Sequence, residues 1–431
     1  MNSTLYESPV RVGTLVLRLT RIIVLTVLAA VRMAAVALTA RRSTRADRLA
    51  AALVWLVERL GGAFIKTGQL AGTRVDLVGP AVARALGRLH DDVSPMTARQ
   101  AARAVRHGLL PATEEIIGAL AAPPVASGSI ASVYRVKLGD RVVALKVRRP
   151  NVGAAITADM AIMRWMAAVA TRLPGLRRVP LAEIIEQVGR CLVKQLDFAA
   201  EAQSLRQMRA HLADSPDVLV PAVIPELCGD GVIAMEFVEG LRHASIRDLP
   251  EPVREAEVVI LVRAVYRLVF IAGFVHVDLH QGNTYFMPDG TVVLLDAGFA
   301  FQLSAAARHS YTAFFGGMIQ GDGAACADIL RSTVRGAAPD ADIDGFRRDV
   351  AELVVRNVGS AVSDFDLPGF CFELFNLQRR YGLYAEPEFI FPMLSLLSLD
   401  GLVKEHHPLM DFQLEAAPYV MQSLISEPEP R

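Results

Sequence analysis

One stretch of the sequence, GFVHVDLHQGNTYFMPDGTVVLLDAGFA at residues 273–300, limits what this chain can fold into more than any other. Its centre predicts two short strands, NTYFM and TVVLL, joined by the turn PDG. Asn283 then ends the loop that enters the first strand, and Asp296 begins the loop that leaves the second. Antiparallel pairing brings these positions together, and Asp278 lies on the same loop as Asn283. We therefore expect two carboxylates and one carboxamide to gather at one point.

Oxygen ligands of this kind are those that Mg²⁺ prefers, in the form of a few carboxylates together with phosphate oxygens. The spacing H-x-D-x-x-x-x-N followed by D-x-G is that of a protein-kinase-like catalytic loop and metal loop. His276, Asp278 and Asn283 match the first pattern, and Asp296 and Gly298 match the second. With a hairpin between them, the two patterns predict a phosphoryl-transfer site. Surface-loop acids without a common role are the alternative.

Such a site also needs a lysine on a strand and an acid on a helix. The run VVALKV places Lys146 on a strand that we expect to be buried, where an unpaired ammonium is costly. The helical stretch VKQLDFAAEAQSL offers Asp197 and Glu201, which are four residues apart and are predicted to share one helix face. Nearby cations would explain two like charges there, and a solvated face is the alternative.

The loop ASGSIASVY precedes Lys146 at the place where a phosphate-covering loop would lie. Small residues in such a loop let backbone N–H groups approach a phosphate. The loop has a single glycine, Gly128, and by itself it is weak evidence.

The rest of the chain predicts the α+β class. Residues 49–122 have helical spacing, and the following stretch alternates like strands around a tight turn at Gly139-Asp140. Residues 156–208 are helical again, GVIAMEFVEG is a short strand, and the chain after Arg254 is mostly helical apart from the hairpin. This order predicts a two-lobed protein with a cleft between its lobes.

The first fifty residues differ from the rest of the chain. Residues 22–40 are almost entirely apolar and are about long enough to span a bilayer. Arg32 lies in their middle, where insertion of an arginine costs roughly 2.5–3.5 kcal/mol. The segment either spans the membrane or lies flat with its arginines at anionic head groups. A helix packed on the protein itself is the alternative, and a cleaved signal peptide is disfavoured because the segment starts late. The flanking arginines are Arg11, Arg18, Arg21, Arg41, Arg42, Arg45 and Arg48.

Charge and cysteine content exclude several classes of function. The formal net charge of zero gives no reason to expect a nucleic-acid partner. The four cysteines, Cys191, Cys228, Cys326 and Cys371, are scattered and form no C-x-x-C pair. They therefore predict neither a disulfide framework nor a zinc site.

With these motifs, the sequence resembles the UbiB/AarF/ADCK family of atypical kinases. FIKTGQLAGTRVDLVGP matches the K-x-G-Q signature of that family at Lys66, Gly68 and Gln69, a signature that ordinary protein kinases lack. ASGSIASVY is similar to its Ala-rich loop, and KQLDFAAEA is similar to its E-x-D motif followed by Glu-Ala. The catalytic and metal loops are the fourth feature.

The resemblance implies a two-lobed, protein-kinase-like α+β fold with a helical N-terminal extension that covers the active site. It assigns residues 1–48 to a membrane-associating segment and 49–121 to the helical extension. It assigns 122–240 to a kinase-like N-lobe and 241–431 to a helical C-lobe. It also implies ATP and Mg²⁺ as cofactors.

The family pattern gives each matching residue a role. Asp278 would be the catalytic-loop acid, Asn283 and Asp296 would hold the metal, and Lys146 would contact the phosphates and pair with Glu201. Lys66 and Gln69 would reach into the cleft near Asp197, and residues 235–238 would be the hinge against adenine. The residues implied to contact the nucleotide are Ala126, Ser127, Gly128, Ser129, Val133, Lys146, Glu236 and Val238.

Two departures from the family pattern affect this expectation. Gln195 stands where the E-x-D motif begins with Glu, which removes a negative charge near Lys66 and the metal. Neutral Gln can still form hydrogen bonds, so we expect the fold to survive and regulation or turnover to change. The loop reads Ala-Ser-Gly-Ser where several alanines are usual, which affects nucleotide preference.

Three functions remain open. The first is a Mg-dependent ATPase or small-molecule kinase of membrane lipid or isoprenoid-quinone metabolism. The second is a nucleotide-binding regulatory pseudokinase with little turnover, and the third, which Lys66 and Gln69 disfavour, is a protein kinase. The expected partners are a membrane lipid or isoprenoid molecule and an anionic membrane surface, with a homodimer or a biosynthetic-complex partner left open. We expect the catalytic lobes at the cytoplasmic face of the membrane.

Overall fold

The structure of the chain is a computed structural model. It describes residues 12–61, 64–65, 67–68, 82, 85–86, 95–109, 113–170, 185–186, 189, 192–241, 246–279, 282–334, 341–357, 366–383 and 386–425. The chain divides into two compact units, one formed by Met1–Ala200 and Val223–Phe237 and the other by Glu201–Ala222 and Val238–Arg431. Helices and three small sheets make up these units, which confirms the α+β class. The four sequence segments proposed above as domains stay predictions.

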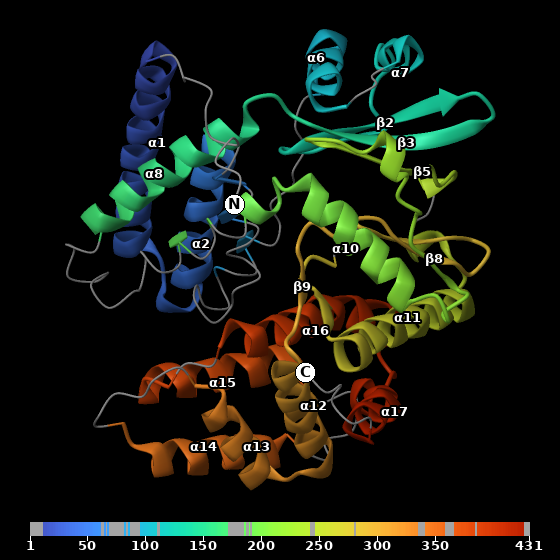
Figure 1. Ribbon diagram of the computed structural model, residues 1–431. Helices are drawn as coiled ribbons and strands as arrows, with labels where there is room; N and C mark the ends of the chain where they lie inside the picture. Colours follow the sequence, from blue (N-terminus) through green and yellow to red (C-terminus); the bar gives the residue numbers. More distant parts are fainter. Residues whose placement is uncertain are drawn as a thin grey trace. The chain divides into compact units, whose positions relative to one another are not determined.

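The first unit combines long helices with one sheet (Figure 1). Its elements are α1 (Val12–Thr39), α2 (Arg42–Leu60), α6 (Ala98–Gly108), α7 (Glu114–Ala119), β1 (Ala126–Ser127), β2 (Ala131–Leu138), β3 (Arg141–Arg148), α8 (Val152–Ala170), η2 (Pro225–Leu227) and β5 (Val232–Glu236). The strands form an antiparallel sheet in the order β1-β2-β3-β5. Gly139 makes the predicted tight turn between β2 and β3 with a φ of 59°, a left-handed conformation that suits glycine.

Two helices cover one face of this sheet. Alternate strand residues, among them Tyr134, Leu145 and Val147, pack with Val105 of α6 and Ile116 of α7 in one buried cluster. Thr97 fixes the start of α6 through a capping box with the side chain of Gln100. Because α6 and α7 occupy this face, the functional side chains that β2 and β3 carry at the intervening positions point to the other face.

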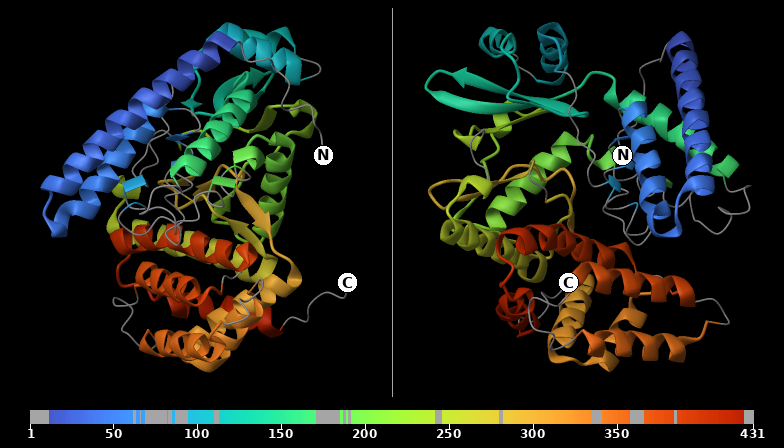
Figure 2. Two further views of the ribbon diagram at one scale, coloured as in Figure 1. Left: turned by 90° about the vertical axis from the view of Figure 1, so that its left-hand side faces the viewer. Right: turned by 180° about the vertical axis from the view of Figure 1, so that it is seen from behind.

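Helices α1 and α2 pack side by side as a hairpin at the start of the chain (Figure 1, Figure 2). The guanidinium of Arg21 donates to the carbonyl oxygen of Arg59 at 2.7 Å. The guanidinium carbon of Arg32 lies 5.5 Å from the ring centroid of Trp55 on α2. Arg32 thus has a cation–π partner on the neighbouring helix, which explains how an arginine is accommodated in the middle of an apolar helix.

Two described helices are long and apolar enough to cross a membrane by length and composition, residues Leu19–Thr39 of α1 and Val152–Val169 of α8. The apolar run of the first was predicted to associate with a membrane, whereas the second was not. Buried Asp159 interrupts the apolar pattern of α8, and Trp165 of the same helix is exposed.

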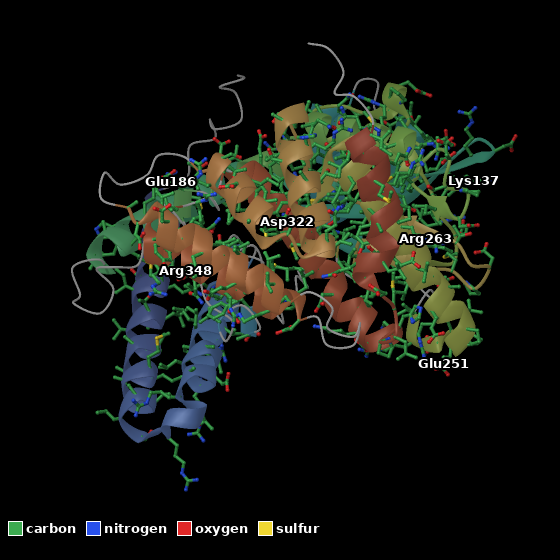
Figure 3. The ribbon with its side chains drawn as sticks, turned by 90° about the horizontal axis from the view of Figure 1, so that it is seen from below. Lys137, Glu186, Glu251, Arg263, Asp322 and Arg348 are labelled. Carbon is green, nitrogen blue, oxygen red and sulfur yellow. The ribbon has the colours of Figure 1, made fainter. Side chains whose placement is uncertain are left out.

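The second unit is mainly helical. Its elements are α10 (Phe198–His211), which begins in the first unit, β4 (Val218–Leu219), η4 (Ile246–Asp248), α11 (Glu251–Tyr266), η5 (Arg267–Ala272), β6 (Phe274–His276), β7 (Thr284–Phe286), β8 (Val292–Leu294), β9 (Ala300–Gln302), α12 (Ala305–Gln320), α13 (Gly323–Ser332), α14 (Ile343–Arg356), α15 (Leu367–Tyr381), α16 (Pro387–His406) and α17 (Phe412–Ile425). Arg263 of α11, which Figure 3 labels, forms an ion pair of 2.8 Å with Glu415 of α17. Asp322, also labelled there, caps α13 by accepting from the backbone N–H of Ala325.

Two small sheets lie in this unit. The predicted hairpin is confirmed as β7 and β8, which pair antiparallel and have β4 as a parallel neighbour. A second pair, β6 with β9, was not predicted. These strands have three residues each, which is too short for an alternating pattern, and no tight turn joins them as one joins β7 to β8.

Candidate active site

The catalytic-loop pattern begins at β6 and ends at β7. Asp278 follows β6 by two residues, and Asn283 immediately precedes β7. The side-chain amide nitrogen Nδ2 of Asn283 donates to the backbone carbonyl oxygen of Asp278 at 3.0 Å. This hydrogen bond brings the two ends of the loop together and directs the amide oxygen of Asn283 away from the Asp278 carbonyl.

The ring of His276 connects this loop to the metal loop. Its Nδ1 accepts a hydrogen bond of 3.2 Å from the backbone N–H of Asp278, and its Nε2 bonds to the backbone carbonyl oxygen of Asp296. A ring that accepts at Nδ1 and meets a carbonyl at Nε2 is the neutral tautomer with the proton on Nε2. His276 itself is buried, and its carbonyl oxygen accepts from Ser395 Oγ of α16 at 2.7 Å. The sequence offered no signal for Ser395, because this serine lies in a different part of the chain within an apolar helix.

The metal loop begins where β8 ends. Leu295 donates its backbone N–H to the carbonyl oxygen of Asn283 at 3.0 Å, which extends the β7–β8 ladder to the predicted pair of metal ligands. The backbone N–H of Gly298 donates to Oδ1 of Asp296 at 2.8 Å and so fixes the orientation of this carboxylate. Asp278, Asn283 and Asp296 are thus joined through short local hydrogen bonds, and their roles in metal binding stay predictions.

Glu201 of α10 brings a second carboxylate to the same place. A Cβ atom at Gly298 would lie 3.2 Å from Oδ1 of Asp296 and 3.4 Å from Oε2 of Glu201. Glu201 is buried, so two like charges approach one backbone position with little water between them. Such an arrangement is favourable when a cation lies nearby.

The donor set fits magnesium. One carboxylate from Asp296 and one carboxamide from Asn283 are hard oxygen ligands, and Mg²⁺ typically takes one or two carboxylates and completes its shell with phosphates and water. Within the described part of the chain, no three His, Cys, Asp or Glu side chains gather as a metal site.

Lys146 lies on β3 in the first unit. It pairs in register with Val133 of β2 and Ile233 of β5, so these three side chains share the sheet face opposite α6 and α7. The ammonium nitrogen of Lys146 is 5.5 Å from the ring centroid of Phe198, the first residue of α10. The contact of Val133 with a nucleotide, which the family pattern implies, stays a prediction. The pairing of Lys146 with Glu201 stays a prediction.

Asp197 does not share a helix face with Glu201, so that expectation was wrong. Helix α10 begins at Phe198, and Oδ1 of Asp197 accepts the backbone N–H of Ala200 at 2.9 Å. Asp197 therefore caps the helix from outside its first turn, where a carboxylate satisfies an otherwise unpaired N–H and meets the positive end of the helix dipole. Glu201 is buried within the helix and Asp197 is exposed.

The predicted phosphate loop connects β1 to β2. Ala126 and Ser127 form β1 and pair with Val133 and Ser132, while Gly128 and Ser129 lie in the connection. At the predicted hinge, Glu236 is the last residue of β5, and the chain passes from the first unit to the second between Phe237 and Val238. The contacts of these residues with a nucleotide stay predictions.

Lys66 and Gln69 lie outside the residues that the structure describes. Gln195, the departure from the family pattern, is described and is 8% exposed. Its side-chain oxygen Oε1 has no hydrogen-bond partner among the atoms that the structure describes. A buried amide oxygen without a partner is unfavourable.

Glu257 of α11 is a second buried acid of this unit. Burial raises the pKa of its carboxyl group to about 7, and the negative charge of Asp289 in the β7–β8 turn adds to the increase. Neither carboxylate oxygen has a hydrogen-bond partner in the described part of the chain. This group was not predictable from the sequence, because Glu257 is one of several acids near the start of what reads as an ordinary surface helix.

A family model described as the ABC1 atypical kinase-like domain matches residues 88–330, more than half of the chain. Two curated proteins named "Probable protein kinase UbiB" are similar to it. The protein from Vibrio vulnificus (strain YJ016) is 28% identical over 395 residues, covering 89% of this chain and 72% of that protein. The protein from Aeromonas hydrophila is 27% identical over 383 residues, covering 87% and 70%.

A solved structure is similar as well. It is the complex of Rv3197 with erythromycin from Mycobacterium tuberculosis, which matches with a TM-score of 0.48 and 19% sequence identity and covers 80% of this chain and 90% of that chain.

Proposed function

Since the chain belongs to the ABC1 atypical kinase-like family, we propose that it binds ATP with Mg²⁺ and transfers or releases the γ-phosphate in membrane lipid or isoprenoid-quinone metabolism. One observation carries this proposal: the ring of His276 joins the backbone of Asp278 to that of Asp296. This connection holds the predicted acid and the predicted metal ligand in one rigid group, as phosphoryl transfer requires.

Each residue then has one task. Asp278 orients a hydroxyl group or a water molecule toward the γ-phosphate and accepts its proton. Asn283 and Asp296 would hold Mg²⁺, which neutralises charge on the phosphate oxygens when it is bound. From the family pattern, Lys146 would bind the phosphates with Glu201 as its partner, and the loop at 126–129, Val133, Glu236 and Val238 would contact the nucleotide. Lys66 and Gln69 belong to a signature that ordinary protein kinases lack, which disfavours a peptide as the acceptor.

The acceptor that we favour is a small lipid head group or water. The two relatives are named as probable protein kinases, so a protein is the alternative acceptor. Labelled phosphate that appears on a protein substrate would support this alternative. We keep the protein kinase as the less favoured function because Lys66 and Gln69 of the K-x-G-Q pattern are foreign to ordinary protein kinases.

A membrane surface is the partner that α1 supports. Its exposed large apolar side chains are Leu19, Ile23, Val24, Val27, Leu28, Val31 and Leu38. At 100° per residue they occupy one half of the helix, while Arg21 and Arg32 turn toward α2. We propose that this half contacts lipid and that the arginines beyond the helix ends meet anionic head groups, with the kinase-like units on the cytoplasmic side.

A regulatory nucleotide-binding protein with little turnover is the second candidate. The partnerless amide oxygen of buried Gln195 favours it, because a neutral amide replaces the acid of the family motif there. Such a protein would bind Mg·ATP and hydrolyse it slowly.

One assay separates these functions. The full-length chain is given Mg·ATP, and phosphate release is measured with and without liposomes that contain anionic lipid. We expect hydrolysis that anionic liposomes stimulate. Tight binding of ATP without phosphate release would favour the regulatory protein, and absence of nucleotide binding would refute both.

A further inference from the structure

The phosphate loop is held by more than its own strand pairing. Gly128 donates its backbone N–H to the carbonyl oxygen of Ala131 at 2.9 Å, and Ser127 Oγ lies 3.0 Å from Ser132 Oγ. Ser132 is fully buried, so this hydroxyl pair anchors the first strand of the loop to the sheet.

Arg149 contacts the same loop at several further points. It lies one residue beyond β3, and its backbone N–H donates to the carbonyl oxygen of Ile130 at 2.8 Å. Its side chain reaches back over the loop, where Nε donates to the carbonyl oxygen of Gly128 at 2.7 Å and Nη2 donates to Ser127 Oγ at 2.8 Å. One residue thus holds three points of the loop.

The chemistry of the side chain suits this arrangement. A guanidinium presents several N–H donors in a planar fork, so it can bind a carbonyl and a hydroxyl at once. Charge-assisted hydrogen bonds of this kind are stronger than neutral ones. A loop that covers phosphates must be ordered when the ligand binds, and the entropy of ordering weakens binding unless the loop is already held.

From these contacts we infer that Arg149 is a positioning residue, which holds the 126–131 loop in its phosphate-covering conformation before a nucleotide arrives. The inference rests on the proposed function, because the ligand is the phosphate chain of an adenine nucleotide. Lys146 binds directly to that ligand in the proposed site, whereas Arg149 acts through the backbone of Gly128 and Ile130. Its position next to the loop also leaves its positive charge where anionic phosphates enter.

Two variants of the full-length chain test this role. Arg149→Met removes the fork, and Arg149→Lys keeps the charge but cannot bind Gly128 and Ser127 with the same planar geometry. Arg141→Met is the matched control, since Arg141 is exposed at the other end of β3. Amide hydrogen exchange of residues 126–131 is measured without nucleotide, and the affinity for Mg·ATP is measured by calorimetry.

We expect Arg149→Met to speed exchange in the loop and to weaken Mg·ATP binding by about tenfold, while kcat at saturating ATP changes much less. Arg149→Lys should recover part of the affinity, and Arg141→Met should match the wild type. A purely structural role would instead lower the thermal midpoint and kcat together.

Three results would overturn the inference. Unchanged loop exchange in Arg149→Met would show that the residue does not hold the loop. Faster loop exchange with wild-type affinity for Mg·ATP would show that holding the loop does not position it for phosphate. Equal losses of Mg·ATP affinity in Arg149→Met and Arg141→Met would show that removing any positive charge on or next to β3 is sufficient to weaken binding. A wild-type chain that binds no adenine nucleotide refutes the proposed function, and the exchange rates then still decide whether Arg149 holds the loop.

Discussion

His276 holds Asp296 by its backbone, because the imidazole Nε2 bonds to the carbonyl oxygen of a residue 20 positions further along the chain. The carboxylate of Asp296 is thereby left to other partners. The histidine of the H-x-D pattern therefore serves as a connector between two loops, since its Nδ1 accepts from the Asp278 N–H.

Replacing His276 with leucine should separate these loops. The Asp278 N–H and the Asp296 carbonyl would lose their shared partner inside the protein, and each buried unpaired group costs about 1–3 kcal/mol. We expect His276→Leu to lower the free energy of unfolding and to lower kcat for ATP hydrolysis by at least about a hundredfold. Urea unfolding and a phosphate-release assay measure the two effects. His309→Leu, at an exposed position of α12, should change neither.

Asp296→Asn should abolish hydrolysis and leave the fold intact. Asparagine has the same shape but lacks the negative charge that a bound Mg²⁺ requires, so we expect more than about a hundredfold loss of kcat and a thermal midpoint close to that of the wild type. Chelation of divalent ions in the wild-type protein should have the same effect, and added Mg²⁺ should reverse it. Asp344→Asn, on the exposed first turn of α14, serves as the control. Hydrolysis that persists in Asp296→Asn would defeat the metal assignment.

The central hairpin and its two loops were predictable because their signals are local. A turn sequence, two apolar runs and fixed spacings place Asn283 beside Asp296, and the pairing of β7 with β8 confirms this. The strand that carries Lys146 was predictable for the same reason, since β2 and β3 join at a glycine turn.

Contacts between distant parts of the sequence were not predictable. Ser395 lies 119 residues from the carbonyl of His276 that it binds, and a serine within an apolar helix indicates no partner. The hydrogen bond from Arg149 Nε to the carbonyl oxygen of Gly128 depends on the direction of one side chain, which the sequence does not indicate. The error at Asp197 has a local cause, because spacing alone does not show whether a helix begins before or after an acid that can cap it.

Gln195→Glu should reveal what the departure from the family motif does. The site is nearly buried and the amide oxygen of Gln195 has no described partner, so an ionised acid there would need a cation. We expect Gln195→Glu to change kcat by about tenfold or more when a lysine or a metal ion lies next to the new carboxylate in the ATP-bound protein. Addition of Mg·ATP should then also raise the thermal midpoint of this variant. Gln195→Met, which keeps the volume and removes the polar group, separates charge from packing. Equal activity in all three proteins would show that this position does not influence turnover.

A charge on the outer half of α1 should weaken membrane binding. Val27→Glu and Val31→Glu place a carboxylate among side chains that are exposed and apolar, and burying that charge in lipid is unfavourable. Co-sedimentation with anionic liposomes should fall by about tenfold or more for the double variant, with hydrolysis in the absence of lipid unchanged. Val355→Glu, an equally exposed valine on α14, should sediment like the wild type. If the double variant of α1 sediments as well as Val355→Glu, α1 is not the lipid-binding surface.

Glu257 should make the stability of the protein depend on pH near neutrality. Its pKa is about 7 in the folded chain against an ordinary value of 4.5, so between these values the folded protein keeps a proton that the unfolded chain has released. The free energy of unfolding therefore falls as pH rises from 4.5 to about 7, and this contribution is constant above that range.

Glu257→Gln cannot ionise, and we expect it to be more stable than the wild type at pH 8 by about 1–3 kcal/mol and nearly equal to it at pH 4.5. Chemical unfolding of both proteins across this range measures the difference. Asp289→Asn should produce a smaller gain in the same direction, because it removes only the second cause of the shift. A constant difference between Glu257→Gln and wild type at every pH would mean that Glu257 is not the titrating group.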